Sequence, residues 1–127
     1  MHSQTTALHK ACSDKHGGTA KQLARAHPEW VGQDDESGSF PLHIAAARGL
    51  ADVVPLLLEV HRGAALKKNK EFGALPMHMA VMSGHADVVE LLIPCGALEE
   101  KDAWGRSPVD LARNGDKPAT RGVGMQK

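Results

Sequence analysis

The amino-acid sequence predicts an all-α repeat solenoid, and two observations support this. Residues 38–58 align without a gap with residues 73–93, and shorter echoes of the same pattern lie at residues 6–11 and 105–112. Within both long copies, apolar residues recur at the spacing of an amphipathic helix. A helical unit that cannot bury its apolar face alone is expected to stack on its neighbours, so the stack is the folding unit.

The repeats divide the chain into about three full units and a C-terminal half unit. The expected units lie at about residues 5–34, 35–69, 70–101 and 102–113. The chain has 127 residues, a length that suits one domain, which we expect to span residues 1–113. Residues 114–127 contain Pro118 and several glycines and lack an apolar stripe, so we expect a flexible C-terminal tail there.

Each unit begins with a turn and a short helix. Gly38, Gly73 and Gly105 suit a turn that needs a positive φ. A proline follows three residues after each glycine, where the first helical turn needs no amide donor. In the two middle units, valine and leucine pairs then form the apolar stripe of a second helix. The first unit differs, because residues 14–18 suggest a looser connection between its helices.

The order of these motifs resembles the ankyrin repeat. Residues 41–46 read Pro-Leu-His-Ile-Ala-Ala, residues 84–92 read Gly-His-Ala-Asp-Val-Val-Glu-Leu-Leu, and residues 63–64 and 96–97 supply a closing Gly-Ala. The resemblance covers about residues 5–113 and implies helix-turn-helix units joined by β-turn or hairpin loops. The residues that match the structural motif are His9, Pro41, Leu42, His43, Pro76, His78, His85 and Pro108.

The histidines and the helix caps carry two further expectations. His9, His43 and His78 occupy one equivalent position in three units, so we expect their rings to bridge turns and neighbouring repeats by hydrogen bonds. Phe40 and Leu75 stand where the repeat usually has threonine, so the hydroxyl that commonly caps the first helix is missing in both middle units.

The composition argues against several classes of protein. Fifteen basic and fifteen acidic residues leave no net charge, unlike the basic face of a nucleic-acid-binding protein. We find no signal-peptide pattern and no apolar run near the roughly 20 residues of a membrane span. Cys12 and Cys95 are expected to lie too far apart to form a disulfide, and free thiols are typical of a reducing compartment. We therefore expect a cytoplasmic protein, with a nuclear location left open.

Few residues could form a catalytic site. His9 and Cys12 could pair a base with a thiol on one helical face, but no third orienting group is identifiable. No Cys-x-x-Cys or His-Glu-x-x-His spacing indicates a metal site, and no glycine-rich loop would hold a phosphate. We therefore expect no enzymatic activity, no metal and no cofactor. A metal- or thiol-dependent enzyme is kept as an alternative.

The resemblance implies a module that binds a protein partner through its turn tips and the concave face of its first helices. The residues just before the turn glycines are Ser37, Phe72 and Trp104, and aromatic rings at two neighbouring tips could anchor a partner. Met79 and Met82 lie three residues apart and share a helical face. The expected partner-binding groove comprises Phe72, Trp104, Met79, Met82 and Arg48.

The half unit at the C-terminal end indicates a second kind of function. Without a second helix there, the third unit is left partly uncovered. Val123 and Met125 could fold back over it, or the chain could be part of a larger assembly that covers it. We therefore expect a monomeric adaptor, scaffold or regulatory module. A structural or regulatory subunit that docks through the uncapped C-terminal repeat is the alternative. The sequence does not identify the partner.

Overall fold

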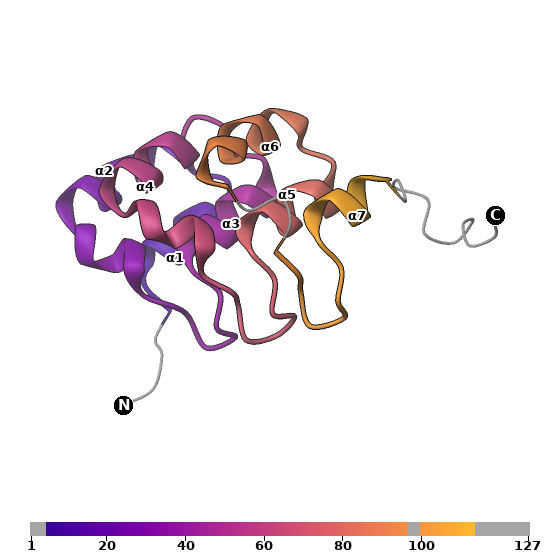
Figure 1. Ribbon diagram of the computed structural model, residues 1–127. Helices are drawn as coiled ribbons and strands as arrows, with labels where there is room; N and C mark the ends of the chain where they lie inside the picture. Colours follow the sequence, from indigo (N-terminus) through magenta and orange to yellow (C-terminus); the bar gives the residue numbers. More distant parts are fainter. Residues whose placement is uncertain (1–4, 97–99, 114–127) are drawn as a thin grey trace.

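The computed structural model describes residues 5–96 and 100–113, and all regular structure in these two ranges is helical (Figure 1). The helices are α1 (Ala7–Ser13), α2 (Gly17–Ala26), α3 (Pro41–Arg48), α4 (Val54–Val60), α5 (Pro76–Ser83), α6 (Ala86–Leu92) and α7 (Pro108–Arg113). Three short 3₁₀ helices are η1 (Pro28–Gly32), η2 (Arg62–Leu66) and η3 (Ile93–Cys95). The expected all-α solenoid is confirmed. The expected tail, residues 114–127 with Val123 and Met125, lies outside the described residues.

The helices form two rows, and the turns project from one side of the stack (Figure 1). In the inner row, α3 packs between α1 and α5, and α7 packs on α5. The outer row consists of α2, α4 and α6, each packed on the inner helix that precedes it in the chain. Within the described residues, the fourth unit has the inner helix α7 and no outer helix.

Proline and glycine set the ends of the inner helices. Pro41, Pro76 and Pro108 are the first residues of α3, α5 and α7, where the fixed φ of proline suits the helix and its missing amide hydrogen is not needed. Gly49 and Gly84 follow α3 and α5 in the left-handed conformation, with φ of 74° and 77°. This conformation closes a helix without steric cost only when the residue is glycine.

The first unit reaches the same helix cap without a glycine. Lys15 has a φ of 62°, and the amide of His16 donates to the Ala11 carbonyl oxygen at 2.8 Å. In the third unit, the amide of His85 donates to the Ala80 carbonyl oxygen in the same way, at 3.0 Å. The expectation of a looser connection was therefore wrong. Packing of α1 on α2 holds a lysine in a conformation that costs a non-glycine residue about 1–2 kcal/mol.

The core is aliphatic and runs through the stack. Its largest fully buried apolar side chains are Leu8, Leu42, Leu57, Leu75, Met77 and Leu92. Ala45, Ala46 and Ala80 are also fully buried, and their small size lets neighbouring inner helices approach closely. Trp30 packs on the edge of this core and stacks on His27, with ring centroids 3.9 Å apart. Burial of these aliphatic faces, at about 25 cal/mol per Å², is the main stabilising contribution to the stack.

One Asp or Asn side chain organises each projecting turn. Asp35, Asn69 and Asp102 occupy equivalent places, and the Oδ1 of each accepts two backbone amides of its own turn at 2.9–3.1 Å. These bonds hold the turn backbone in place of a longer β-ladder. The expected positive φ is found at the turn glycines, Gly38, Gly73 and Gly105.

The two middle units differ in what covers the end of the inner helix. A Cβ built on Gly49 would lie 2.5 Å from Nδ1 of His85, because that ring from the next unit packs on this glycine. At the equivalent Gly84, no described atom lies within 4 Å of such a Cβ. The junction between the second and third units is therefore closed, whereas no described residue covers the C-terminal side of the third unit at this point.

This difference predicts unequal effects of one substitution at two equivalent glycines. Gly84→Ala is expected to lower the free energy of unfolding by about 1–2 kcal/mol, the cost of left-handed alanine. Gly49→Ala is expected to cost at least about 1 kcal/mol more, because its methyl group must displace the His85 ring. Urea unfolding of the wild type and both variants measures the two losses. Equal losses would show that the ring does not close this junction.

Candidate protein-binding surfaces

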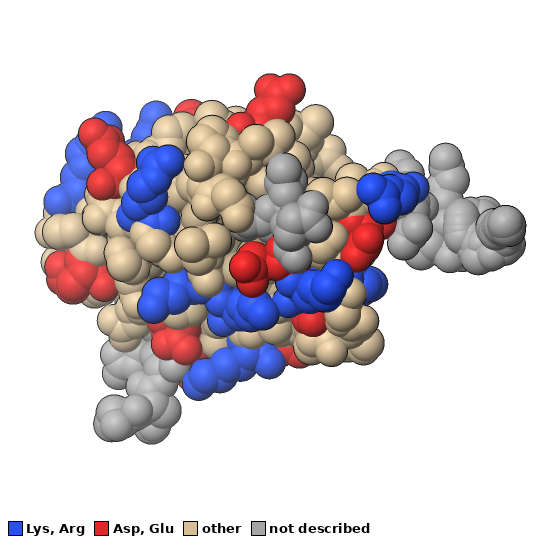
Figure 2. Space-filling model, viewed as in Figure 1, with Lys and Arg blue, Asp and Glu red and all other residues tan. Residues whose placement is uncertain are grey.

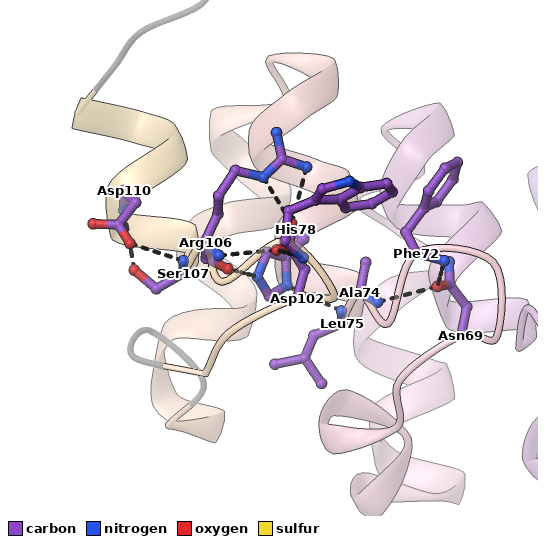
Figure 3. Close-up of polar contacts among 10 residues, drawn as sticks. Asn69, Phe72, Ala74, Leu75, His78, Asp102, Arg106, Ser107 and Asp110 are labelled. Carbon is purple, nitrogen blue, oxygen red and sulfur yellow. Dashed lines mark hydrogen bonds and ion pairs between the residues drawn. The ribbon is translucent and has the colours of Figure 1, made fainter.

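Three buried histidine side chains join each unit to the turn of the next. The Nε2 atoms of His9, His43 and His78 lie 3.1, 2.8 and 2.8 Å from a backbone carbonyl oxygen one unit further along the chain, and Figure 3 shows this contact for His78. In that order, the carbonyl groups belong to Ser39, Ala74 and Arg106. These bonds connect successive turns to successive inner helices and keep the turns in register.

The second ring nitrogen fixes the protonation state of these histidines. Nδ1 of His43 accepts the backbone amide of Phe40 at 3.1 Å, and Nδ1 of His78 accepts that of Leu75 at 3.0 Å. An accepting Nδ1 carries no hydrogen, so Nε2 carries it and donates to the carbonyl oxygen. The ring thus satisfies the amide of the residue before each helix, although Phe40 and Leu75 themselves offer no side-chain acceptor to the helix.

Burial lowers the pKa of all three rings. Desolvation is the largest cause in each case, and it lowers the pKa of His43 to about 4. The pKa values of His9 and His78 are also lowered, mainly by burial, although bonds to backbone carbonyl groups and nearby carboxylates act in the opposite direction. Protonation would also bring a hydrogen on Nδ1 against an amide hydrogen. The rings are therefore held neutral.

The other residues of the structural motif lie within or between the helices. Pro41, Pro76 and Pro108 are buried at the starts of α3, α5 and α7, and Leu42 is fully buried beside the first of them. His85 is half-buried, with its ring on Gly49. These residues position the helices.

Two aromatic rings meet at the tips of the second and third turns. The ring centroids of Phe72 and Trp104 are 5.7 Å apart, with 38° between the planes. Trp104 is 60% exposed and Phe72 is half-buried. The amide of Ala103 donates to the Phe72 carbonyl oxygen at 2.8 Å and so ties the two turns together. The pair forms one continuous aromatic surface on two linked turns.

An arginine and a buried aspartate hold the third tip. The Arg106 guanidinium carbon lies 5.2 Å from the Trp104 ring centroid, and its Nε and terminal nitrogen lie 3.0 and 2.9 Å from Oδ2 of Asp102 (Figure 3). Burial acts to raise the pKa of Asp102, but hydrogen bonds from Arg106 and Trp104 outweigh it and lower the pKa. The carboxylate stays ionised and fixes the guanidinium beside the indole, which limits the freedom of both.

The expected groove falls into two parts. Arg48 and Met79 line one hollow of about 360 Å³ on the inner helices. Phe72 and Trp104 meet at the turn tips and are not among its lining residues. Met82 is exposed and lies outside that lining too. The structure therefore brings Arg48 together with Met79, and Phe72 together with Trp104, without joining all five into a single groove.

A second hollow, of about 400 Å³, lies at the C-terminal end of the stack. Gly84, His85, Ala86 and Val89 of the third unit line it, with Leu111 of α7 on its other side. Comparable space between the second and third units is filled by α6 and the His85 ring. This hollow is thus the place where a further outer helix would pack.

The groups considered for catalysis are not arranged for it. Cys12 is fully buried, and desolvation raises its pKa to about 12, so its thiol is protonated near neutral pH. Both ring nitrogens of His9 are already engaged, with Thr6 and Ser39. Among the described residues, no three His, Cys, Asp or Glu side chains form a group that could hold a metal ion. In the same part of the chain, no helix is long and apolar enough to cross a membrane.

Comparison with protein-family models matches two stretches of the chain. Residues 1–70 match a model of three ankyrin repeats, and residues 72–103 match the ankyrin-repeat model. A search of curated proteins found no match. The chain belongs to the ankyrin-repeat family, whose members are generally non-enzymatic modules of protein–protein interaction.

Three functional residues escaped the sequence reasoning. Asp35, Asn69 and Asp102 were not among the residues singled out from the sequence, yet each of them builds its turn. The available signal was an Asp or Asn three or four residues before every turn glycine. That spacing is typical of side chains that bond to the backbone of their own turn.

The neutral histidine bridges predict a fold that weakens in mild acid. Because their folded pKa lies below the unfolded value of about 6.5, the unfolded chain binds more protons as the pH falls. The free energy of unfolding contributed by the neutral rings is fully present above the unfolded pKa and is lost progressively as the pH falls toward the folded pKa, about 4 for His43. Below the folded pKa, the loss from His43 alone would amount to about 3 kcal/mol of the free energy of unfolding.

Urea unfolding from about pH 7.5 to about pH 5, where ordinary carboxyl groups remain ionised, measures this loss. His43→Gln is the matched variant, since it removes the titrating ring and keeps a side chain that can hydrogen-bond. Its free energy of unfolding should depend less steeply on pH than that of the wild type. A wild-type value that stays constant across this range contradicts the prediction.

Proposed function

We propose that this protein is an adaptor, scaffold or regulatory module that binds a protein partner through its turn tips and the concave face of its inner helices. The Phe72–Trp104 pair, of which Trp104 is 60% exposed, carries the proposal. Membership of a family of protein-binding modules supports it. Contiguous apolar surface at an exposed site often marks a protein–protein interaction site.

The tips are suited to strong binding because they are already ordered. Trp104 is held between Phe72 on the neighbouring turn and the Arg106 guanidinium, which in turn is fixed by Asp102. A partner that covers the rings would gain aromatic burial without the full cost of immobilising them. Buried aromatic anchors often contribute about 2 kcal/mol or more each to an interface.

Charged side chains around the turns support selective encounter with a partner. Lys and Arg side chains gather in a band between the helices and the turn tips (Figure 2). Lys67 and Lys68 are exposed, whereas Nζ of Lys70 lies 3.9 Å from Oδ2 of Asp34 on the preceding turn. Since the whole chain has no net charge, this band favours a protein with a complementary patch over a nucleic acid.

We further propose that the protein acts as a monomer in the cytoplasm or nucleus, with neither a membrane nor a nucleic acid as its partner. The two free cysteines, Cys12 and Cys95, support a reducing compartment. On the first outer helix, Thr19, Gln22 and Arg25 form an exposed polar face, as expected of a terminal repeat that faces water.

The tip proposal predicts loss of partner binding when both rings are removed. The double variant Phe72→Ala, Trp104→Ala is compared with wild type in recovery of binding proteins from a native cell extract. Partners retained by wild type should be depleted at least about tenfold with the variant, because the anchors are gone. Trp104 is exposed and Phe72 is only half-buried, so the melting temperature should fall by a few degrees at most, and thermal melting checks that the variant folds.

A matched control removes two other exposed apolar side chains. Leu66 on η2 and Ile93 on η3 are 53% and 43% exposed, and Leu66→Ala, Ile93→Ala should leave the partner set unchanged. If this control loses the partners while the tip variant keeps them, the binding surface lies on the side of the 3₁₀ helices and the proposal is wrong.

The open C-terminal hollow favours a second candidate function, that of a subunit in a larger assembly. Its occupant would be a helix of a partner protein that continues the outer row, because α6 fills the corresponding place one unit earlier. A second copy stacked head to tail fits less well, since it would bring the polar face of α2 onto this apolar hollow.

The subunit candidate predicts a different pattern of loss. Ala86 is exposed at the hollow, and Ala86→Arg should block a docking helix without disturbing the core. Ala26→Arg, at an exposed alanine that ends α2, is the control. Light scattering over a range of concentrations, with partner recovery from extract, separates the candidates. Loss of partners with Ala86→Arg alone would favour the subunit role, and retention would exclude it.

A further inference from the structure

One repeat position on the inner helices carries a different side chain in each unit. Asp14, Arg48 and Ser83 each lie five residues after the bridging histidine of their unit, at the ends of α1, α3 and α5. Residues that hold the fold recur from unit to unit, as the bridging histidines do. A position that takes an acid, a base and a hydroxyl group is not set by the stacking of the units, so its chemistry is available for recognition.

The fold does not require an arginine at the end of α3. Arg48 is exposed in the last turn of that helix, and Gly49 then ends the helix in the left-handed conformation. The helix α5 ends at Gly84 in the same conformation, and it has no basic residue in its last turn. A positive charge favours the C-terminal end of a helix, but α5 shows that this helix end forms without one.

The Arg48 guanidinium has no charged partner among the described residues. It makes no ion pair or hydrogen bond with any of them. The hollow of about 360 Å³ that it lines contains no carboxylate, and the one histidine there, His43, is neutral. On the neighbouring helix, Asp14 pairs with Lys10, whose Nζ lies 3.5 Å from Oδ2. Arg48 is therefore an uncompensated positive charge on α3, between α1 and α5.

The other residues that line this hollow suit a carboxylate on a short apolar stem. Ser13 of α1 and Ser83 of α5 are exposed and bring a hydroxyl group to it from each neighbouring helix, and a hydroxyl group can donate to a carboxylate oxygen. Ile44 and Met79 are half-buried and pack against the core, so they offer apolar surface to the methylene groups of a ligand. A guanidinium binds a carboxylate through two parallel hydrogen bonds.

We propose that this hollow receives an acidic side chain of the partner protein, a glutamate or an aspartate, with its carboxylate on Arg48. The single positive charge of Arg48 matches the single negative charge of a carboxylate better than the charge of about −2 on a phosphate group. This inference rests on the proposed function and specifies the partner. The aromatic turn tips then supply apolar burial, whereas Arg48 selects a partner by charge.

Selection from a phage-displayed library of random short peptides supplies the ligand for the test. Peptides that wild type enriches should share an acidic residue. For the best synthetic peptide, replacing that residue with its amide, or changing the protein by Arg48→Gln, should weaken binding at least about tenfold. Because both changes remove the same contact, together they should weaken binding little more than either alone. With Arg48→Glu, a lysine at that peptide position should bind better than the acid.

Two further variants make the test specific to this hollow. Arg25→Gln is the matched control, because Arg25 is also an exposed arginine in the last turn of a helix but lies on α2; it should bind the peptide as wild type does. Ser83→Asp places a carboxylate in the lining of the hollow, where it can pair with Arg48 and should weaken binding of the peptide. Thermal melting of every variant shows that it folds.

Three outcomes would overturn the inference. Wild type may enrich no peptide, the enriched peptides may share no acidic residue, or Arg48→Gln may bind the best peptide unchanged. In each case, loss of extract partners with the Phe72, Trp104 double variant leaves the proposed function standing. Retention of those partners by the double variant contradicts the tip proposal instead, whatever the peptides show.

Discussion

The hydrogen bond from a neutral, buried imidazole to the next turn is the interaction on which the rest of this structure depends. Each ring satisfies an amide in its own unit through Nδ1 and a carbonyl group in the following unit through Nε2. Because Nε2 bonds to a carbonyl oxygen of the following unit, the hydrogen bonds of each histidine are satisfied only when the next unit is present. In the fourth unit, Ser107 and Asp110 occupy the positions of the cap residue and the histidine of the earlier units. Their amides and side chains bond to each other at 3.0 and 3.1 Å (Figure 3), so this helix start needs no later turn.

The same arrangement explains why the turns can carry exposed aromatic rings. A turn that projects into water has few apolar contacts of its own, and its conformation must come from polar bonds. Asp102 supplies two of them to the backbone and a third to Arg106, while His78 holds the Arg106 carbonyl group from the helix side. Trp104 therefore sits on a backbone fixed from two directions. The fold rests on buried polar groups and aliphatic helices, so Trp104 can stay exposed, where we propose that it contacts a partner.

The repeat pattern was enough to predict the fold, because each element depended on a local rule. Pro41 and Pro76 start helices, Gly49 and Gly84 end them, and the valine and leucine stripes face inward. The sequence failed where tertiary packing overrides such a rule. Lys15 was expected to loosen a connection and instead takes the left-handed conformation of a glycine, because the packing of α1 on α2 requires it. The proposed groove of five residues also divided in two. The repeat pattern shows which positions are equivalent, but it does not show how a turn is oriented relative to its helix. In the structure, the Phe72–Trp104 pair lies at the turn tips, apart from the hollow that Arg48 and Met79 line.

The C-terminal hollow and the concave face of the inner helices differ in chemical character, and this bears on what each surface can recognise. In the fourth unit, Ser107 and Asp110 satisfy the polar groups at the start of α7, whereas no described residue covers the apolar surface at Gly84 and Val89. An apolar hollow of this kind can stabilise a partner by burial, but it discriminates poorly between partners of similar shape. The two hollows over the inner helices have the opposite character, because their lining residues include charged side chains of both signs, Lys10, Asp14, Asp35 and Arg48. We therefore expect the inner helices and the turns to determine specificity for a protein partner. A contact at the C-terminal hollow is expected to increase affinity with little effect on specificity.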